Sequence, residues 1–401
     1  MESIKEIYKI GNGPSSSHTM GPKSAALKFA QDNHDAFSFR VTLYGSMAAT
    51  GKGHLTDVAI EQVFAARKKT LDLIWEPQIF LPQHPNGLKF EALAIDGTIK
   101  KEWITFSIGG GDLSDSGKRE PKTKRYQSST MANILKWCRQ NGTTFWEYVA
   151  LHEESDIFDY LAEVWKVMKS AVKRGLENEG VIPGGLKLPR KAASFHIKAR
   201  GYQGSMQRRS VTFSYALAVA EENASGGVIV TAPTCGSCGV LPGVMYLSQK
   251  HYDFTDKQII RALATAGLIG NLIKTNASIS GAEVGCQGEI GSACAMSAAA
   301  SVQLFGGTVG QIEYAAAMGM EHFLGLTCDP INGLVQIPCI ERNAFAAGRA
   351  IDSNMYALLS DGYHLVSFDS VVEAMKRTGH DLPRIYKETA EGGLASLSNF
   401  L

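Results

Sequence analysis

The sequence predicts an α+β protein in which a small N-terminal α/β domain precedes a larger, mostly helical C-terminal domain. Three observations support this class: strand-like alternation in the first third, a polar and charged segment after it, and helix-capping patterns beyond. At 401 residues the chain is long enough for two compact domains. We therefore expect an α/β domain at residues 1–115, a linker at 116–130 and a helical domain at 131–401.

Strand patterns occupy the first third of the chain. Residues 37–44, FSFRVTLY, alternate apolar and polar side chains, as a half-buried strand does. The dipeptide Asp96-Gly97 separates two further strand-like runs, which is typical of a tight β-hairpin. Residues 111–130 carry few large apolar side chains, so they predict a linker or mobile loop.

Helical signals dominate the rest of the chain. Pairs that match the capping box are Thr255 with Gln258, Thr308 with Gln311, and Ser370 with Glu373. Glycine pairs at 226–227, 306–307 and 392–393 mark positions where helices can end. The uncharged stretch 290–312 is rich in Ala, Ser and Gly, so it predicts a deeply buried helix and its turn and not a membrane span.

The charge balance excludes some classes of partner. Forty basic and 39 acidic residues leave a formal charge of +1, which lacks the one-signed field that nucleic acid or a charged membrane surface requires. A small-molecule partner is the expectation. The start, MESIKEIYKIGNGP, lacks the apolar core of a secretory signal, so a cytoplasmic location is predicted.

Seven cysteines without an export signal favour metal or catalytic roles over disulfides. Cys286 precedes an Ala-rich helix, whose N-terminus favours a thiolate. Cys328 is expected after a helix that ends at Leu326, and Cys339 closes a twelve-residue loop that Gly333 allows to fold back. Three thiolates can thus converge from two loops. Three sulfur ligands leave an open position, which suits iron with sulfide, or zinc.

A simpler interpretation of these cysteines is that they are small, buried, apolar side chains. Cys138 and Cys294 are predicted to be such core residues. Cys235 and Cys238 form a C-x-x-C, which could be a redox dithiol or half of a zinc site. Because a glycine and a proline follow, we favour a structural loop near the site over a dithiol that opens a helix.

Two N-terminal segments carry candidate ligand-binding residues. The loop 13–22, GPSSSHTMGP, offers hydroxyls and backbone donors to an anion, although an ordinary N-cap cluster explains it equally well. Its candidate side chains are Ser16, Ser17, His18 and Thr19. Pro22 then suits the first turn of a helix.

The segment GSMAATGKGHLTD misses the phosphate-loop pattern, so ATP binding is not supported. Its His54, on a glycine-rich loop after a strand, is placed to act as a base, although a lone histidine is more often structural. In HPNG, Asn86 can hydrogen-bond a carboxylate or simply form an Asn-Gly turn.

Several motifs taken together resemble the single-chain form of the iron-sulfur L-serine dehydratases, and the resemblance covers nearly the whole chain. In order they are GPSSSHTMGP, GKGH, HPNG, IPGGL, TAPTCGSCG, GAEVGCQGEIGSAC and CDPINGLVQIPCIERN. The resemblance implies dehydration and deamination of L-serine to pyruvate and ammonia, and thus a role in amino-acid degradation and gluconeogenesis. It also implies that the first domain resembles the allosteric substrate-binding domain of some phosphoglycerate dehydrogenases. The resemblance further implies an active site between the domains and assembly into a homodimer.

The resemblance assigns roles to individual residues. It implies a [4Fe-4S] cluster held by Cys286, Cys328 and Cys339, with one iron not ligated by protein and free to act as a Lewis acid. His54 matches the base for the Cα proton. The positions that match contacts of the substrate carboxylate are Ser16, Ser17, His18, Thr19 and Asn86.

Some features depart from the family or leave alternatives open. Asn332 stands where the family usually has glycine, and the chain ends SLSNFL without the terminal cysteine of some members. A related lyase acting on L-cysteine or L-threonine, and a non-catalytic sensor with a structural metal, are the alternatives. Pyridoxal phosphate is not expected, and Lys274 is the one lysine worth checking for a Schiff base.

Overall fold

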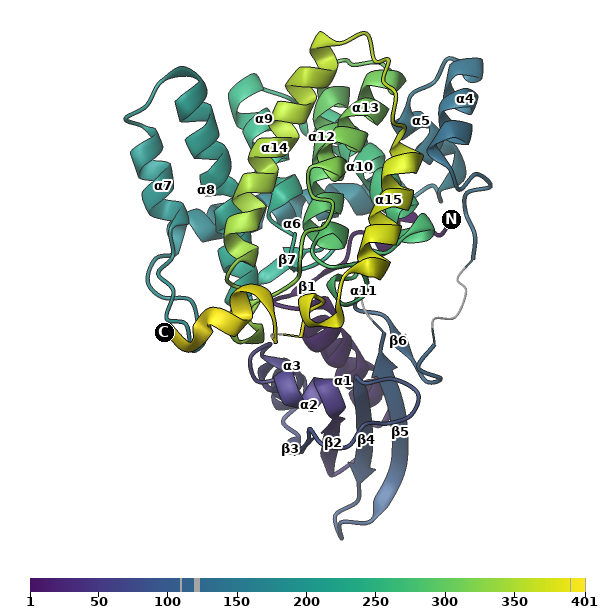
Figure 1. Ribbon diagram of the computed structural model, residues 1–401. Coiled ribbons are helices and arrows are strands. Elements are labelled where there is room, and N and C mark those ends of the chain that lie inside the picture. The colour runs from purple at the N-terminus through teal and green to yellow at the C-terminus, as the bar shows by residue number, and fades with distance from the viewer. Residues whose placement is uncertain (109, 119–122, 390, 401) are drawn as a thin grey trace. The chain divides into compact units, whose positions relative to one another are not determined.

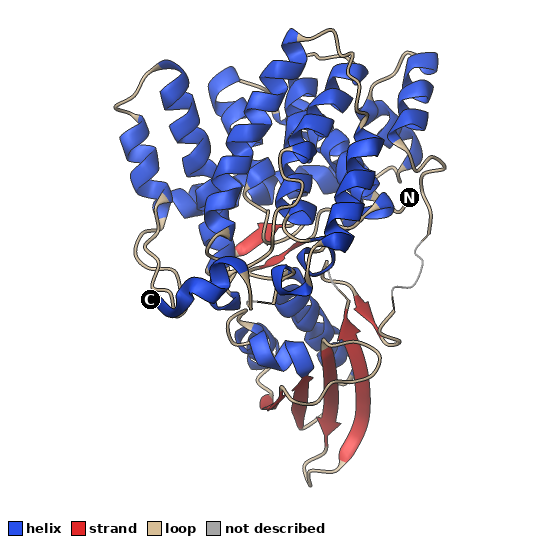
Figure 2. Cartoon of the chain, in the orientation of Figure 1, coloured by secondary structure: helices blue, strands red, loops and turns tan. Residues whose placement is uncertain are grey.

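The computed structural model describes residues 1–108, 110–118, 123–389 and 391–400. It contains two compact units. The α/β unit spans Gly11–Pro121, and the helical unit combines Met1–Ile10 with Lys122–Leu401. The predicted α+β class is confirmed, since a five-stranded sheet lies in the α/β unit and helices make up most of the other (Figure 2).

The first ten residues therefore group with the helical unit and not with the α/β unit. The predicted domain limits remain a proposal, and part of the predicted linker 116–130 lies outside the described residues.

The α/β unit is built on a five-stranded sheet with the order β3-β2-β4-β5-β6. Strands β2 and β3 pair in parallel, and the other neighbours are antiparallel. Its elements are β1 (Ile10–Asn12, which begins in the other unit), η2 (Ser16–Met20), α1 (Gly21–Asp32), β2 (Ser38–Tyr44), α2 (Gly45–Thr50), α3 (Thr56–Ala65), β3 (Thr70–Glu76), β4 (Gly87–Leu93), β5 (Ile99–Ser107) and β6 (Leu113–Ser114).

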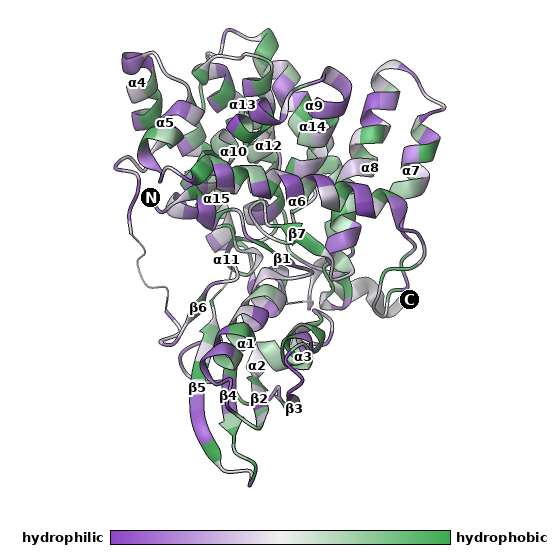
Figure 3. Ribbon diagram, turned by 180° about the vertical axis from the view of Figure 1, so that it is seen from behind, coloured by the Kyte–Doolittle hydropathy of each residue, from purple (hydrophilic) through white to green (hydrophobic). Residues whose placement is uncertain are grey.

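The alternating pattern at 37–44 forms β2 as predicted, with Phe39, Val41 and Leu43 buried against α1 and α3. Phe37 lies just before the strand and is exposed. The hairpin is also confirmed, since Gly97 has φ +82° in the turn between β4 and β5. Four consecutive residues at the start of β5 are exposed, and most of this part is hydrophilic (Figure 3), so both faces of the sheet are solvated at this end.

The helical unit contains the remaining described elements. They are η1 (Ile4–Glu6), α4 (Met131–Asn141), α5 (Phe145–His152), α6 (Ile157–Glu177), α7 (Ala192–Ala199), α8 (Gly204–Ala224), β7 (Val228–Val230), α9 (Val240–Tyr252), α10 (Asp256–Asn276), α11 (Gly281–Val284), η3 (Gln287–Gly291), α12 (Ser292–Leu304), α13 (Val309–Glu321), η4 (Ile331–Gly333), α14 (Cys339–Leu359), α15 (Phe368–Asp381), η5 (Arg384–Tyr386) and η6 (Gly393–Phe400).

Helix α12 forms the centre of this unit (Figure 1). It is buried from Ser292 to Val302 and packs against α9, α10, α13 and α14. Its Ala and Ser side chains let the neighbouring helices approach closely on all sides. The deeply buried helix predicted from the uncharged stretch is therefore confirmed. In the described part of the chain, no helix has both the length and the apolar character needed to span a membrane.

Two of the three predicted capping boxes are confirmed. Thr255 caps α10 and Thr308 caps α13, each with the reciprocal glutamine bond. The third prediction is wrong, because α15 starts earlier and its cap is Ser367, whose hydroxyl accepts the N–H of Ser370. Ser370 thus lies inside the first turn, where its own N–H already needs a partner.

The N-terminal segment is held in the helical unit by close packing against α10. Ile4 and Tyr8 are fully buried, and the Tyr8 hydroxyl donates to the Leu263 carbonyl over 2.7 Å. A Cβ at Gly267 would lie 2.9 Å from the Tyr8 ring and 3.1 Å from Ile4. Only a glycine leaves room for these side chains, which explains why residues 1–10 fold with α10.

The crossing of α6 and α8 provides a test of the packing. A Cβ at Gly175 would lie 2.1 Å from the Ala218 carbonyl oxygen, so Gly175→Ala must push the two helices apart. We expect the free energy of unfolding to fall by about 2 kcal/mol in urea denaturation. Gly185→Ala is the control because its Cβ would meet open space, and its effect should stay within about 0.5 kcal/mol. Equal effects of both substitutions would contradict the packing.

Candidate functional site

The candidate residues gather in two clusters, one in each unit. The histidine cluster, in the α/β unit, comprises Ser15 to Thr19, His54, Thr56, Asn86 and Ser107. The cysteine cluster, in the helical unit, comprises Cys286, Glu289, Cys328, Cys339 and Arg342.

The segment predicted as a polar loop at 13–22 is instead mostly helical. Residues Ser16–Met20 form the helical turn η2, which runs directly into α1. Ser15 caps it, since its hydroxyl accepts the His18 N–H over 3.1 Å. Pro22 lies in the first turn of α1, as predicted. The serine-rich pattern thus acts as a helix N-cap, which places His18 and Thr19 on a rigid turn.

His54 follows α2 in a tight turn that leads to α3, so the predicted glycine-rich loop after β2 is largely helical too. The His54 side chain is buried, and its Nδ1 lies 3.0 Å from the Thr50 carbonyl oxygen. A carbonyl oxygen can only accept, so Nδ1 carries the proton in this arrangement. In the neutral ring, Nε2 is then the basic nitrogen.

The structure brings the two histidines together. Their rings stack with centroids 4.8 Å apart and an interplanar angle of 29°. Burial lowers the pKa of His54. Burial also lowers the pKa of His18 to about 3, helped by the nearby charges of His54 and His84 and opposed by the Ser46 backbone. Both rings are therefore neutral near pH 7, which a proton acceptor requires.

The other predicted residues of this unit surround the histidines. The Ser17 hydroxyl lies 2.9 Å from Nδ1 of His18, and Ser16 is half-buried one position earlier. Asn86 connects to them through Ser107, which accepts from its amide and donates to the Ser17 carbonyl. Nε2 of His18 and Oδ1 of Asn86 are buried without a normal hydrogen bond among the described residues. Such atoms retain hydrogen-bonding capacity for a ligand.

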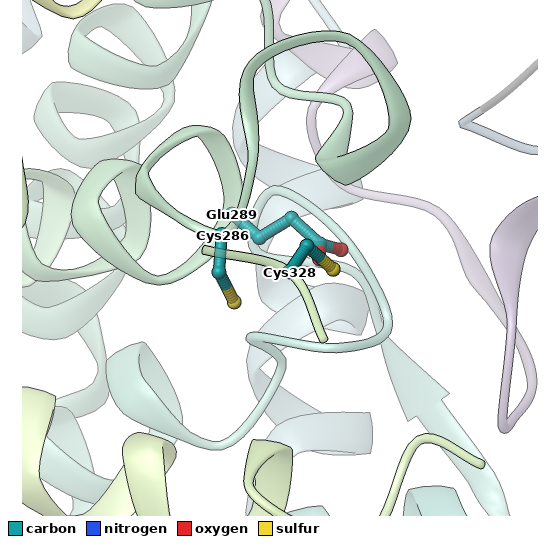
Figure 4. Close-up of side chains that lie close together, drawn as sticks. All are labelled: Cys286, Glu289 and Cys328. Carbon is teal, nitrogen blue, oxygen red and sulfur yellow. The ribbon is translucent and has the colours of Figure 1, made fainter. Parts of the chain in front are cut away.

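The cysteine cluster starts at the entry to the central helix. Cys286 caps η3, which continues into α12, as the sequence predicted. Its sulfur, the Cys328 sulfur and a Glu289 carboxylate oxygen all lie within 4.8 Å of one another, and the Glu289 carboxylate points toward Cys328 (Figure 4). Cys339 is not a member of this 4.8 Å group. It is buried at the start of α14, where the charge of Cys286 acts on its thiol.

The predicted helix before Cys328 is shorter than expected, because α13 ends at Glu321 and a turn follows. Cys328 instead lies in an extended segment that is paired with the C-terminal part of the chain. Its N–H donates to the Tyr386 carbonyl over 2.8 Å, and its carbonyl accepts from Glu388 N–H over 2.7 Å. Two backbone hydrogen bonds to the same neighbouring segment fix the position of this thiol.

The loop from Cys328 to Cys339 depends on two left-handed residues. Asn332 has φ +55° and Gly333 has φ +67°. Asparagine is among the non-glycine side chains that tolerate this conformation best, so it fits the position. Asn343 anchors the end of the loop: its amide group donates to the Cys339 and Gly236 carbonyls, and its oxygen accepts from Gly239 N–H.

Charged side chains that the sequence prediction missed complete this cluster. Glu289 takes a 2.6 Å hydrogen bond from Thr234, and desolvation of its carboxyl raises its pKa. Arg342 donates to the Thr327 carbonyl and to Asp329. Both residues follow a cysteine by three positions at a helix start, in C-x-x-E and C-x-x-R. That spacing puts them one turn along the same face, so the signal was present in the sequence.

The thiols and carboxyls of this cluster oppose ionisation in one another. The pKa of Cys328 is raised first by its hydrogen bond with Cys286 and then by burial. Desolvation raises the pKa of the Glu388 carboxyl to about 8, and the charge of Glu289 raises it further. The Glu388 residue as a whole is nevertheless exposed. Acidic groups crowded in one place disfavour one another's charged forms, and a bound metal cation would offset that repulsion.

The remaining cysteines are all free and buried. Cys138 and Cys294 lie in helices as predicted. Cys235 and Cys238 lie in a loop whose Gly236 and Thr234 contact Glu289. The expectation that no helix opens after this C-x-x-C is wrong, because α9 begins at Val240. Pro242 lies in the first turn of this helix, where the backbone N–H that proline lacks would have no partner within the helix.

The buried histidines generate a pH prediction. Below pH 6.5 the unfolded chain protonates His18, whereas the folded chain does so only near pH 3, so the free energy of unfolding falls as pH drops through this window. The full effect is up to roughly 5 kcal/mol. In urea denaturation, His18→Phe should make the free energy of unfolding depend less on pH between pH 6.5 and 4. Substitution of the exposed His251 by Phe should leave that pH dependence unchanged. Parallel curves for all three proteins would rule out this linkage.

Comparison with known proteins matches both units to one family. The family model "Serine dehydratase alpha chain" matches residues 120–395, and "Serine dehydratase beta chain" matches residues 3–67. The chain is 40% identical to L-serine dehydratase of Streptomyces coelicolor, with 98% of each chain covered. It is 39% identical to L-serine dehydratase of Haemophilus influenzae, with 98% of this chain and 99% of the relative covered. It is 38% identical to L-serine dehydratase 2 of Escherichia coli, with 98% of each chain covered. The chain therefore belongs to the serine dehydratase family.

Proposed function

We propose that this protein is a lyase that dehydrates and deaminates L-serine to pyruvate and ammonia. The observation that carries the proposal is the similarity to L-serine dehydratases along 98% of this chain and at least 98% of the three relatives named above. The buried cysteine cluster and the neutral histidine pair are the chemical groups that such a reaction needs.

A [4Fe-4S] cluster fits the donor set of the helical unit. Cys286, Cys328 and Cys339 are buried and free, and in the described residues no disulfide consumes them. These three residues would hold the cluster, with one iron left without a protein ligand. When bound, the cluster supplies a Lewis acid that weakens the bond between Cβ and the hydroxyl of the substrate.

His54 is the proposed base for the Cα proton. Its Nδ1 hydrogen bond to the Thr50 carbonyl leaves Nε2 as the accepting atom, and its lowered pKa keeps that atom unprotonated at neutral pH. The Cα proton goes to Nε2, the bond between Cβ and oxygen breaks, and the leaving hydroxide takes up the proton from Nε2 to become water. The resulting enamine tautomerises to an imine, which water hydrolyses to pyruvate and ammonia.

The proposed contacts of the substrate carboxylate are Ser16, Ser17, His18 and Asn86. Nε2 of His18 supports this assignment, because it is buried without a normal hydrogen bond among the described residues and, when protonated, would donate to an anionic ligand. Thr19 was implied by the same resemblance, but both its N–H and its hydroxyl are engaged within the unit. A homodimer and a cytoplasmic location remain predictions.

The decisive experiment is anaerobic purification followed by iron and sulfide analysis and a turnover assay with L-serine. Pyruvate release that depends on the cluster supports the proposal. A colourless, iron-free and fully active protein contradicts it, as does stoichiometric zinc without turnover. Comparing L-serine with L-threonine and L-cysteine identifies the preferred substrate, since one methyl group changes binding by only about 1–3 kcal/mol.

The ligand assignment predicts the metal content of cysteine variants. Cys286→Ala, Cys328→Ala and Cys339→Ala should each reduce cluster iron to background after anaerobic reconstitution, because each removes one of only three ligands. Cys138→Ala is the matched control, since that thiol is equally buried but lies in α4. Its iron content should equal that of the wild type. Full iron in all three ligand variants would exclude the assignment.

The base assignment predicts a separation of activity from cofactor content. His54→Ala should lower kcat by about 10²- to 10⁴-fold, the usual contribution of a general base, while iron and sulfide per chain stay unchanged. Steady-state kinetics with L-serine and metal analysis on the same sample measure both quantities. Near-normal turnover of the variant would remove His54 from this role.

A further inference from the structure

Two threonines exchange hydrogen bonds between the segments that carry the histidines. Thr19, next to His18, donates its hydroxyl proton to the His54 carbonyl over 2.7 Å. Thr56, two residues after His54, donates its hydroxyl proton to the His18 carbonyl over 2.5 Å. Each histidine backbone is therefore held by a threonine from the opposite segment, and these bonds join η2 to the turn before α3.

Both hydroxyls are shielded from water. Thr19 is 2% exposed and Thr56 is fully buried. A hydrogen bond in such surroundings is strong, and an orphaned buried carbonyl is costly. The Thr19 hydroxyl also accepts the Ser15 N–H over 3.2 Å, so its proton and one lone pair are already committed. This side chain therefore acts on His54 rather than on a ligand.

The turn that these bonds hold is strained. Leu55, between His54 and Thr56, has φ +56° and ψ +32°, the left-handed region that costs a non-glycine residue roughly 1–2 kcal/mol. Leucine gains nothing there from a local side-chain hydrogen bond, unlike asparagine. The conformation persists because its neighbours are fixed on both sides: the His54 carbonyl by Thr19, and the Thr56 side chain by His18.

We propose that Thr19 and Thr56 form a clamp that positions His54, holding its ring against His18 with Nε2 as the basic nitrogen. This inference rests on the proposed role of His54 as the base. The two threonines are positioning residues, since each acts through a histidine backbone. The clamp fixes the turn, the turn fixes the direction of the His54 side chain, and the Thr50 carbonyl then selects the tautomer with Nδ1 protonated.

The test compares Thr56→Val with Thr56→Ser. Valine keeps the shape and loses the donor, whereas serine keeps the donor. We expect Thr56→Val to lower kcat by about 10- to 100-fold with KM changed by less than about threefold, because a small displacement of a catalytic group has an effect of this size. Thr56→Ser should restore kcat to within about threefold. Thr98→Val is the matched control: it removes a threonine hydroxyl that donates to Asp96 in the exposed β4–β5 turn, and kcat should not change.

A second measurement does not depend on turnover. In the full chain without metal, histidine ring nitrogen signals report the tautomer of His54, assigned with His54→Ala. Wild type and Thr56→Ser should show one tautomer with Nδ1 protonated, and Thr56→Val a mixture. Unchanged kcat and tautomer in Thr56→Val overturn the clamp, as does equal impairment of the valine and serine variants. If His54→Ala keeps its activity, the base assignment fails while the tautomer still tests the clamp.

Discussion

The packing of α12 is the constraint on which the cysteine cluster depends. This helix is buried along nearly its whole length, so its position is fixed by the helices around it. Cys286 and Glu289 lie at its entry, Cys339 begins a helix that packs on it, and Cys328 follows another. Small side chains along α12 bring these helices close together, and their ends then carry the three thiols toward one region.

A second constraint is the desolvation of ionisable groups. In the α/β unit, burial lowers the pKa of both imidazoles, and the adjacent His54 adds to the effect on His18, which suits proton acceptance. In the helical unit, burial and crowding raise the pKa values of thiols and carboxyls. The same physical effect therefore prepares one cluster to accept a proton and the other to release protons when a cation binds.

The accuracy of the sequence predictions followed the range of the interactions involved. The half-buried strand β2 and the caps at Thr255 and Thr308 depend on neighbours along the chain, and they were predicted correctly. The burial of α12 was also predicted correctly, because its uncharged composition indicates burial whichever helices surround it. The serine-rich segment was predicted as a loop because its polar side chains suit a loop and an N-cap equally well. The parallel strand β3 went unnoticed, because its pairing with β2 is made across a helical connection.

The sequence alone determined the fold class, the order of the family motifs and the set of candidate side chains. The tertiary structure decided which of these side chains meet. Thr56 became a partner of His18, and Thr234 of Glu289, because turns and helix ends from distant parts of the chain converge. Local pattern encodes secondary structure through backbone preferences. Contacts between remote residues depend on how whole elements pack, and a single sequence does not display that packing.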